Sequence, residues 1–185
     1  MTWLRGTAAL SADRAYRYLL TRRWGDGSAM TWIMLNPSTA DAAEDDPTIR
    51  RCIGFARREG CEAIQVVNLF ALRAADPRDL LASPDPAGPG NDGFLLARPL
   101  AACTIAAWGA RGSLHGRSAE VRAMLAGARL LCLGVTSGGE PRHPLYARAD
   151  TPLVPFPVTV PARGVTFHGS AAGRSLTNSG PGGPC

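Results

Sequence analysis

The side chains best suited to chemistry in this sequence lie where apolar runs give way to polar residues. Asn36 follows the apolar run 32–35. Asn68 interrupts a second run, 63–70, and His143 lies in a polar stretch that contains proline. A carboxamide offers a paired donor and acceptor, which suits an amide-like edge of a bound molecule, and an imidazole can donate a proton near neutral pH. These residues predict a polar site assembled from distant parts of the chain.

Three aspartates follow Asn36 closely, namely Asp41, Asp45 and Asp46. One of these carboxylates, or the amide of Asn36, could orient a water molecule for attack. The same residues also have structural interpretations: Asn36 can close a turn through its own side chain, and Asp46 before Pro47 is typical of a helix start. No His pair or Glu-x-x-His accompanies the acids, so we expect no metal site.

Further residues could bind a substrate around these groups. Asn68 could hold an amide-like base edge, although an amide inside an apolar strand can equally be a structural group with its own partners. Arg73 and Arg142 could hold phosphate, because a guanidinium group binds phosphate through paired hydrogen bonds. Trp108 could stack on a base or pack in the core.

The elements that must position these residues alternate along the chain. Apolar runs typical of buried strands occupy residues 32–35, 63–70, 103–108 and 130–134. Helical patterns lie between them, and together they predict a three-layer α/β/α fold with a mainly parallel central sheet of about four strands. Residues 14–35 are expected to add an N-terminal antiparallel hairpin. Right-handed crossovers then bring the polar loops to one edge of the sheet.

The bulk properties favour a single domain that can bind an anion. The sequence has 185 residues and a net charge of +5, all of its positive side chains being arginine. We expect one α/β domain over 1–157 and a disordered Gly/Ser/Pro-rich tail over 158–185. No apolar run approaches the ~20 residues of a membrane span, and no signal peptide is recognisable, so the sequence predicts a soluble cytoplasmic protein without a membrane partner.

Several motifs resemble an uncharacterised bacterial family, number 1643 among the domains of unknown function. The resemblance covers roughly residues 8–157. It is carried in order by 34–41, 45–52, 66–71, 85–92, 107–109 and 141–146. The family name implies no activity.

A more distant likeness does imply one. Asn36-Pro37, Asn68 and His143-Pro144 are similar in type and order to residues of uracil-DNA glycosylases. The likeness implies hydrolysis of the N-glycosidic bond between a base and its sugar. In that interpretation Asn36 or Asp41 orients the water, Asn68 holds the base, and His143 donates to the departing base.

This sequence departs from those enzymes at two positions. Leu35 stands where they have a glycine two residues before the proline, and Leu145 replaces the serine that follows His-Pro. The first change narrows the room for a base beside the main chain. The second removes a phosphate contact from a loop that intercalates into DNA.

A second class of function stays open, in which the protein binds or processes a phosphorylated small molecule. Ser38-Thr39 and the main-chain amides at the start of the predicted helix 47–59 could hold an anion without catalysis. No phosphate-binding glycine loop or dinucleotide fingerprint occurs, so we expect no cofactor. The expected partner is DNA or a nucleotide in the first interpretation and a phosphorylated small molecule in the second.

Overall fold

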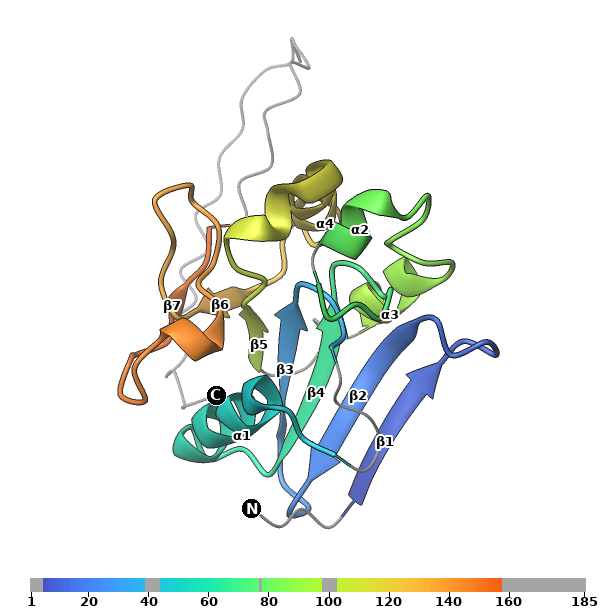
Figure 1. Ribbon diagram of the computed structural model, residues 1–185. Helices are drawn as coiled ribbons and strands as arrows, with labels where there is room; N and C mark the ends of the chain where they lie inside the picture. The colour runs from blue at the N-terminus through green and yellow to red at the C-terminus, as the bar shows by residue number, and fades with distance from the viewer. Residues whose placement is uncertain (1–4, 39–43, 77, 98–102, 158–185) are drawn as a thin grey trace, which may run out of the picture.

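The computed structural model of this protein describes residues 5–38, 44–76, 78–97 and 103–157. Figure 1 shows these residues as a β-sheet with helices packed against it. Asp41 and the predicted tail, 158–185, lie outside the described residues.

The described strands form one seven-stranded mixed sheet. In chain order they are β1 (Arg5–Leu10), β2 (Arg17–Arg23), β3 (Ala29–Met34), β4 (Ala63–Asn68), β5 (Cys103–Ala106), β6 (Leu130–Cys132) and β7 (Val154–Pro155). Their order across the sheet is β1-β2-β4-β3-β5-β6-β7. The neighbours β4, β3, β5 and β6 are parallel, and β1, β2 and β7 are antiparallel to their neighbours. The α/β class is therefore confirmed in general terms, but the sheet is larger and more antiparallel than the sequence predicted.

The predicted hairpin over residues 14–35 is wrong. Strand β4 lies between β2 and β3, so that Val66 pairs with Leu20 on one side and with Trp32 on the other. The connection from β2 to β3 spans the intervening strand, and Glu62, just before β4, binds it. The amide of Trp24 donates to the main-chain oxygen of Glu62 at 2.9 Å. Local turn signals cannot reveal this insertion, because the intervening strand comes later in the chain.

Four α-helices and two 3-10 helices accompany the described strands. They are α1 (Pro47–Arg58), α2 (Arg78–Ala82), α3 (Asn91–Ala97), η1 (Ala110–Gly116), α4 (Arg117–Met124) and η2 (Pro144–Tyr146). The helix predicted over 47–59 is confirmed as α1. The carboxylate of Asp46 caps it by accepting from the amide of Ile49 at 2.8 Å. None of the described helices is long and apolar enough to cross a membrane.

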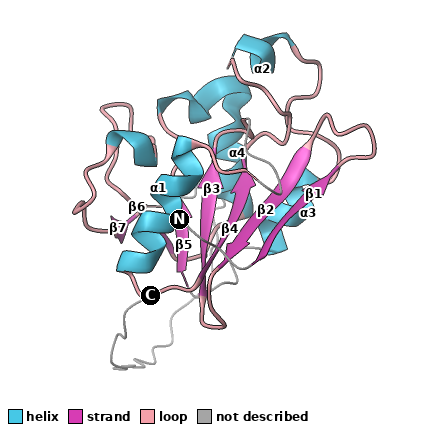
Figure 2. Ribbon diagram, turned by 60° about the horizontal axis from the view of Figure 1, so that its bottom comes forward, coloured by secondary structure: helices cyan, strands magenta, loops and turns pink. Residues whose placement is uncertain are grey.

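The side chains of alternate strand residues pack in two separate hydrophobic cores, because successive side chains of a strand point to opposite faces of the sheet. Trp32 packs with the buried face of α1. Ile33 packs with Leu80 of α2, Leu95 of α3 and Val121 of α4. Helices thus cover both faces of the sheet (Figures 1 and 2). The chain leaves β3 through α1 and reaches β5 through α2 and α3, so neighbouring strands β3 and β5 are connected on opposite faces. Open α/β sheets bind ligands at the carboxyl ends of such strands.

Candidate functional site at the carboxyl edge of the sheet

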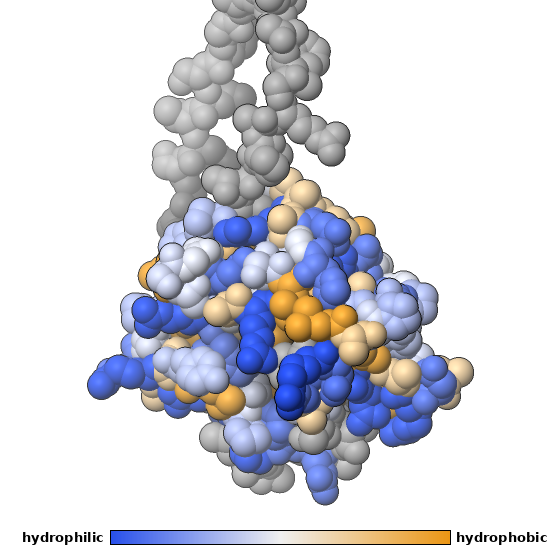
Figure 3. Space-filling model, turned by 45° about the horizontal axis from the view of Figure 1, so that its top comes forward, coloured by the Kyte–Doolittle hydropathy of each residue, from blue (hydrophilic) through white to orange (hydrophobic). Residues whose placement is uncertain are grey.

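A cavity of about 460 Å³ opens at the carboxyl ends of the parallel strands. Each strand contributes to its wall: Asn36 follows β3, Asn68 ends β4, Gly109 follows β5 and His143 follows β6. Figure 3 turns this edge toward the viewer and shows an apolar area bordered by hydrophilic residues. The volume lies within the range of small-molecule sites.

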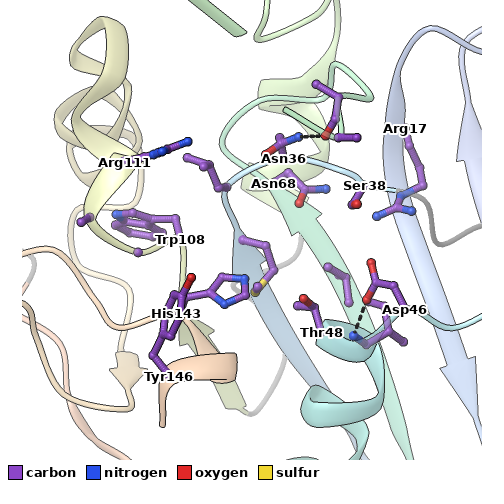
Figure 4. A pocket seen from close by; sticks show the side chains of 18 residues that line it. Arg17, Asn36, Ser38, Asp46, Thr48, Asn68, Trp108, Arg111, His143 and Tyr146 are labelled. Atoms are coloured by element: carbon purple, nitrogen blue, oxygen red, sulfur yellow. Dashed lines mark hydrogen bonds between the residues drawn. The ribbon is translucent and has the colours of Figure 1, made fainter. Parts of the chain in front are cut away.

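Asn68 is the most informative residue of this cavity. Its side chain is buried, the residue being 1% exposed, and it points from β4 into the cavity (Figure 4). Neither Nδ2 nor Oδ1 has a hydrogen-bond partner among the described residues. A buried amide without partners costs about 1–3 kcal/mol of stability for each unsatisfied group. Both polar atoms of Asn68 are therefore available to an ordered water molecule or to a bound group in the cavity.

The side-chain nitrogen of Asn36 makes hydrogen bonds that stabilise the fold. Its Nδ2 donates to the main-chain oxygens of Pro37 at 3.0 Å and of Ala74 at 2.8 Å. The amide therefore ties the loop after β3 to the loop after β4, which agrees with the turn-closing interpretation. Its oxygen, Oδ1, is an acceptor that these bonds do not use. Asn36 can therefore support the fold and still accept a hydrogen bond from a water molecule in the cavity.

His143 presents its imidazole to the cavity from the loop between β6 and η2 (Figure 4). Its Nδ1 accepts from the amide of Leu145 at 3.3 Å, which leaves the proton of the neutral ring on Nε2. Burial lowers the pKa of His143 below its ordinary value of 6.5, and the carboxylate of Asp46 partly opposes this shift. The geometry and the pKa thus favour a neutral imidazole with Nε2–H as its free donor.

Trp108 forms part of the cavity wall and is also fixed in the core. Its Nε1 donates to Oε2 of Glu140 at 2.6 Å, and Oγ of Ser118 donates to the other carboxylate oxygen at 2.7 Å. The indole meets Phe156 edge to face, with ring centroids 5.5 Å apart. These contacts establish a packing role for Trp108. Stacking of this ring on a base stays a prediction.

Comparison with known protein families identifies the family of this chain. Residues 17–145 match the family DUF1643, described as a protein of unknown function. The chain belongs to the DUF1643 family. The matched region contains the whole predicted site, from Asn36 to His143. No curated protein and no solved structure matches the chain. The resemblance to the family is thereby confirmed, whereas the likeness to uracil-DNA glycosylases is not.

Two arginines of this DUF1643 protein line the cavity but were not identified from the sequence. Arg17 on β2 is buried and faces Asp46 and Ser38 (Figure 4). Arg111 lies in η1 on the other side of the cavity. Arginine is common in this chain, so nothing in the sequence distinguishes these two positions. Only the pairing of β2 with β4 brings Arg17 to the site.

Other predicted residues of the DUF1643 chain lie elsewhere. Arg142 is exposed outside the cavity, and its Nε donates to the main-chain oxygen of Val135 at 3.1 Å. Asp45 forms an ion pair with buried Arg22 at 2.7 Å, whereas Asp46 lines the cavity. Arg73 lines a second hollow beside the cavity. In the part of the chain that the structure describes, no three His, Cys, Asp or Glu side chains gather as a metal site requires.

Proposed function

We propose that this DUF1643-family protein binds a nucleobase in the cavity and hydrolyses the N-glycosidic bond that joins the base to its sugar, in DNA or in a nucleotide. The carboxamide of Asn68, which has no hydrogen-bond partner among the described residues, carries the proposal. The edges of nucleobases place a hydrogen-bond donor beside an acceptor, and a carboxamide has the complementary pair. Binding such an edge would satisfy both polar atoms of Asn68 at once.

The other groups of the cavity suit the bond cleavage. Hydrolysis breaks the bond between the sugar C1′ and the base nitrogen, and the oxygen of water forms the new bond to C1′. One proton of the water stays on the new hydroxyl group of the sugar, and the other ends on the released base. Nε2–H of His143 can donate a hydrogen bond to the base as negative charge develops on it. Oδ1 of Asn36 can accept a hydrogen bond from the attacking water and orient it. Asp41, outside the described residues, stays a predicted alternative for that role.

A non-catalytic or hydrolytic binding module for a phosphorylated small molecule is the second candidate. Three features of the cavity favour it: the buried guanidinium of Arg17, the guanidinium of Arg111, and the amino-terminal end of α1 at Thr48. Cationic side chains and a helix start both attract anions. This candidate does not release a base, so an assay for base release separates the two candidates.

The test is a base-release assay on a panel of nucleosides, nucleotides and DNA oligomers that carry deaminated or alkylated bases. We expect release of a free base from at least one substrate, detected by chromatography. His143→Gln should reduce the rate by about 100-fold or more, the usual effect of losing an acid-base group. Asn68→Leu should abolish release through loss of base binding.

His115→Gln is the matched control. His115 is exposed and lies outside the cavity, with Nε2 3.1 Å from the main-chain oxygen of Leu80. Its rate should equal that of the wild type. Ligand binding without release from any substrate would favour the phosphorylated small molecule as the natural ligand.

A further inference from the structure

A second hollow adjoins the cavity and has a different chemical character. Its volume is about 380 Å³, and it shares Ser38, Ala74 and Ala75 with the wall of the first. Arg14 and Arg73 also line it. No acidic residue is among its described lining residues. A ligand that fills the cavity beside Asn68 can therefore extend past Ser38 into a compartment whose charged groups are two guanidinium groups.

Arg73 has hydrogen-bonding capacity that the described part of the protein does not use. Its side chain is half-buried, and one terminal nitrogen donates to the main-chain oxygen of Arg14 at 3.3 Å. Its Nε is buried without a partner among the described residues. An unpaired guanidinium nitrogen is costly to bury, and a phosphate oxygen is the acceptor that best suits it.

Arg14 is held beside Arg73 by an uncommon main-chain conformation. Its φ is +60°, in the left-handed region that non-glycine residues seldom adopt. Its amide donates to the main-chain oxygen of Ser11 at 2.9 Å, and its carbonyl accepts from Arg73. The turn therefore links the two arginines through the main chain and leaves the side chain of Arg14 exposed at the rim of the hollow.

We infer that this second hollow is a phosphate subsite, in which Arg73 and Arg14 bind the phosphate of a ligand whose base lies against Asn68. The inference rests on the proposed function and narrows it: the ligand is a phosphorylated nucleoside unit, not a free base or nucleoside. The phosphate can be the monoester of a nucleotide or a diester of a DNA strand. Both present the same anionic oxygens to the two arginines.

The test compares the affinity for the common nucleosides and 2′-deoxyuridine with that for their 5′-monophosphates, by calorimetry. We expect at least one monophosphate to bind about 10-fold or more tighter than its nucleoside, since hydrogen bonds to charged groups are worth about 1.5–3 kcal/mol. Arg73→Gln should reduce that preference to about 3-fold or less and leave the affinity for the nucleoside unchanged. Arg14→Gln, at an exposed position, should weaken the preference in the same direction without affecting folding.

Arg142→Gln is the matched control, because Arg142 is an exposed arginine that lines neither compartment. It should keep the full preference. Equal binding of nucleosides and monophosphates by the wild type, or an unchanged preference in Arg73→Gln, would overturn the inference. Failure of every monophosphate and of inorganic phosphate to bind would overturn it as well.

Two further arms distinguish this inference from the proposed function and identify the source of the phosphate. Inorganic phosphate that binds through Arg73, together with nucleoside binding that Asn68→Leu does not weaken, would support the subsite and contradict base recognition by Asn68. Tighter binding of a single-stranded oligonucleotide than of a mononucleotide, with steep weakening by salt, would assign the phosphate to a DNA strand. Equal binding of the two would assign it to a free nucleotide.

Discussion

The side-chain nitrogen of Asn91 lies 3.0 Å from the main-chain oxygen of Asn68 and donates to it. The same nitrogen donates to the main-chain oxygen of Leu69 at 3.1 Å, and Arg117 Nε adds a bond to that oxygen at 2.9 Å. Asn91 is fully buried at the start of α3. The two buried asparagines thus have different roles. Asn91 fixes the main chain at the end of β4. Asn68 is held there with its carboxamide turned into the cavity.

This difference predicts that the same substitution, asparagine to leucine, has opposite effects on the free energy of unfolding at positions 68 and 91. Asn68→Leu removes an amide that has no described partners, so the free energy of unfolding should rise by about 1 kcal/mol. Asn91→Leu leaves two buried carbonyls with fewer donors, so the free energy of unfolding should fall by about 2 kcal/mol. Urea denaturation of both variants measures these changes. Equal destabilisation by the two substitutions would show that Asn68 is a structural amide.

Local signals explain how much of the fold could be predicted. Asp46-Pro47 and Gly60 bound α1, and each acts through the main chain of its own neighbourhood, so the helix follows from the sequence. The parallel strands are buried on both faces and therefore form continuous apolar runs. Strand β1 (Arg5–Leu10) has no such run, because it lies at the edge of the sheet beside β2, and the sequence analysis missed it.

Some residues of the candidate site could also be predicted, because they have local signals in the sequence. Asn68 stands out because an amide is unusual within an apolar run, and His143 because proline follows it. Arg17 gives no comparable signal: its burial depends on β2 pairing with β4, whose residues come more than 40 positions later in the chain. A contact between segments so far apart leaves no trace in the local pattern of either segment.

Gly112 leaves room for the indole ring of Trp108, because glycine has no Cβ. A Cβ at this position would lie 2.0 Å from Cδ1 of the indole, so Gly112→Ala must displace the ring and weaken its bond to Glu140. We expect a loss of about 2 kcal/mol in the free energy of unfolding and an altered near-UV circular dichroism spectrum.

Gly54→Ala in α1 is the control for that substitution, because the added methyl group has no described atom within 4 Å apart from its chain neighbours and the main chain of its own helix. It should stabilise the protein by about 0.5–1 kcal/mol, the usual gain of alanine over glycine in a helix. If Gly112→Ala were as well tolerated as Gly54→Ala, the position of Trp108 would not depend on Gly112.

His143 should make stability depend on pH in one direction. Burial lowers the pKa of His143 in the folded protein below 6.5, so the unfolded chain takes up this proton first as the pH falls. The stabilising contribution is therefore complete above pH 6.5 and is lost progressively as the pH falls below that value. Between about pH 7.5 and about pH 5.5 the free energy of unfolding of the wild type should fall more than that of His143→Gln. Parallel losses in the two proteins would contradict a lowered pKa.

The ion pair of Arg22 and Asp45 should be a strong determinant of stability. The side chain of Arg22 is fully buried, and its Nε lies 2.7 Å from Oδ1 of Asp45. Asp45→Ala leaves a buried guanidinium without this carboxylate, and we expect a loss of about 3 kcal/mol in thermal or urea unfolding. Asp150→Ala breaks the exposed pair with Arg148 and should leave the unfolding transition unchanged. Similar effects of the two substitutions would mean that burial does not strengthen the first pair.

The most direct measurement is the nuclear magnetic resonance signal of the Asn68 side-chain amide, assigned by its disappearance in Asn68→Leu. During titration with a base-containing ligand identified by the release or binding assays, both Nδ2 protons of Asn68 should shift as the ligand saturates the protein, and those of Asn91 should shift far less. That result would place the base edge on the one buried amide that has no described partner. Saturation with ligand while the Asn68 signal stays unmoved would contradict base recognition at this site.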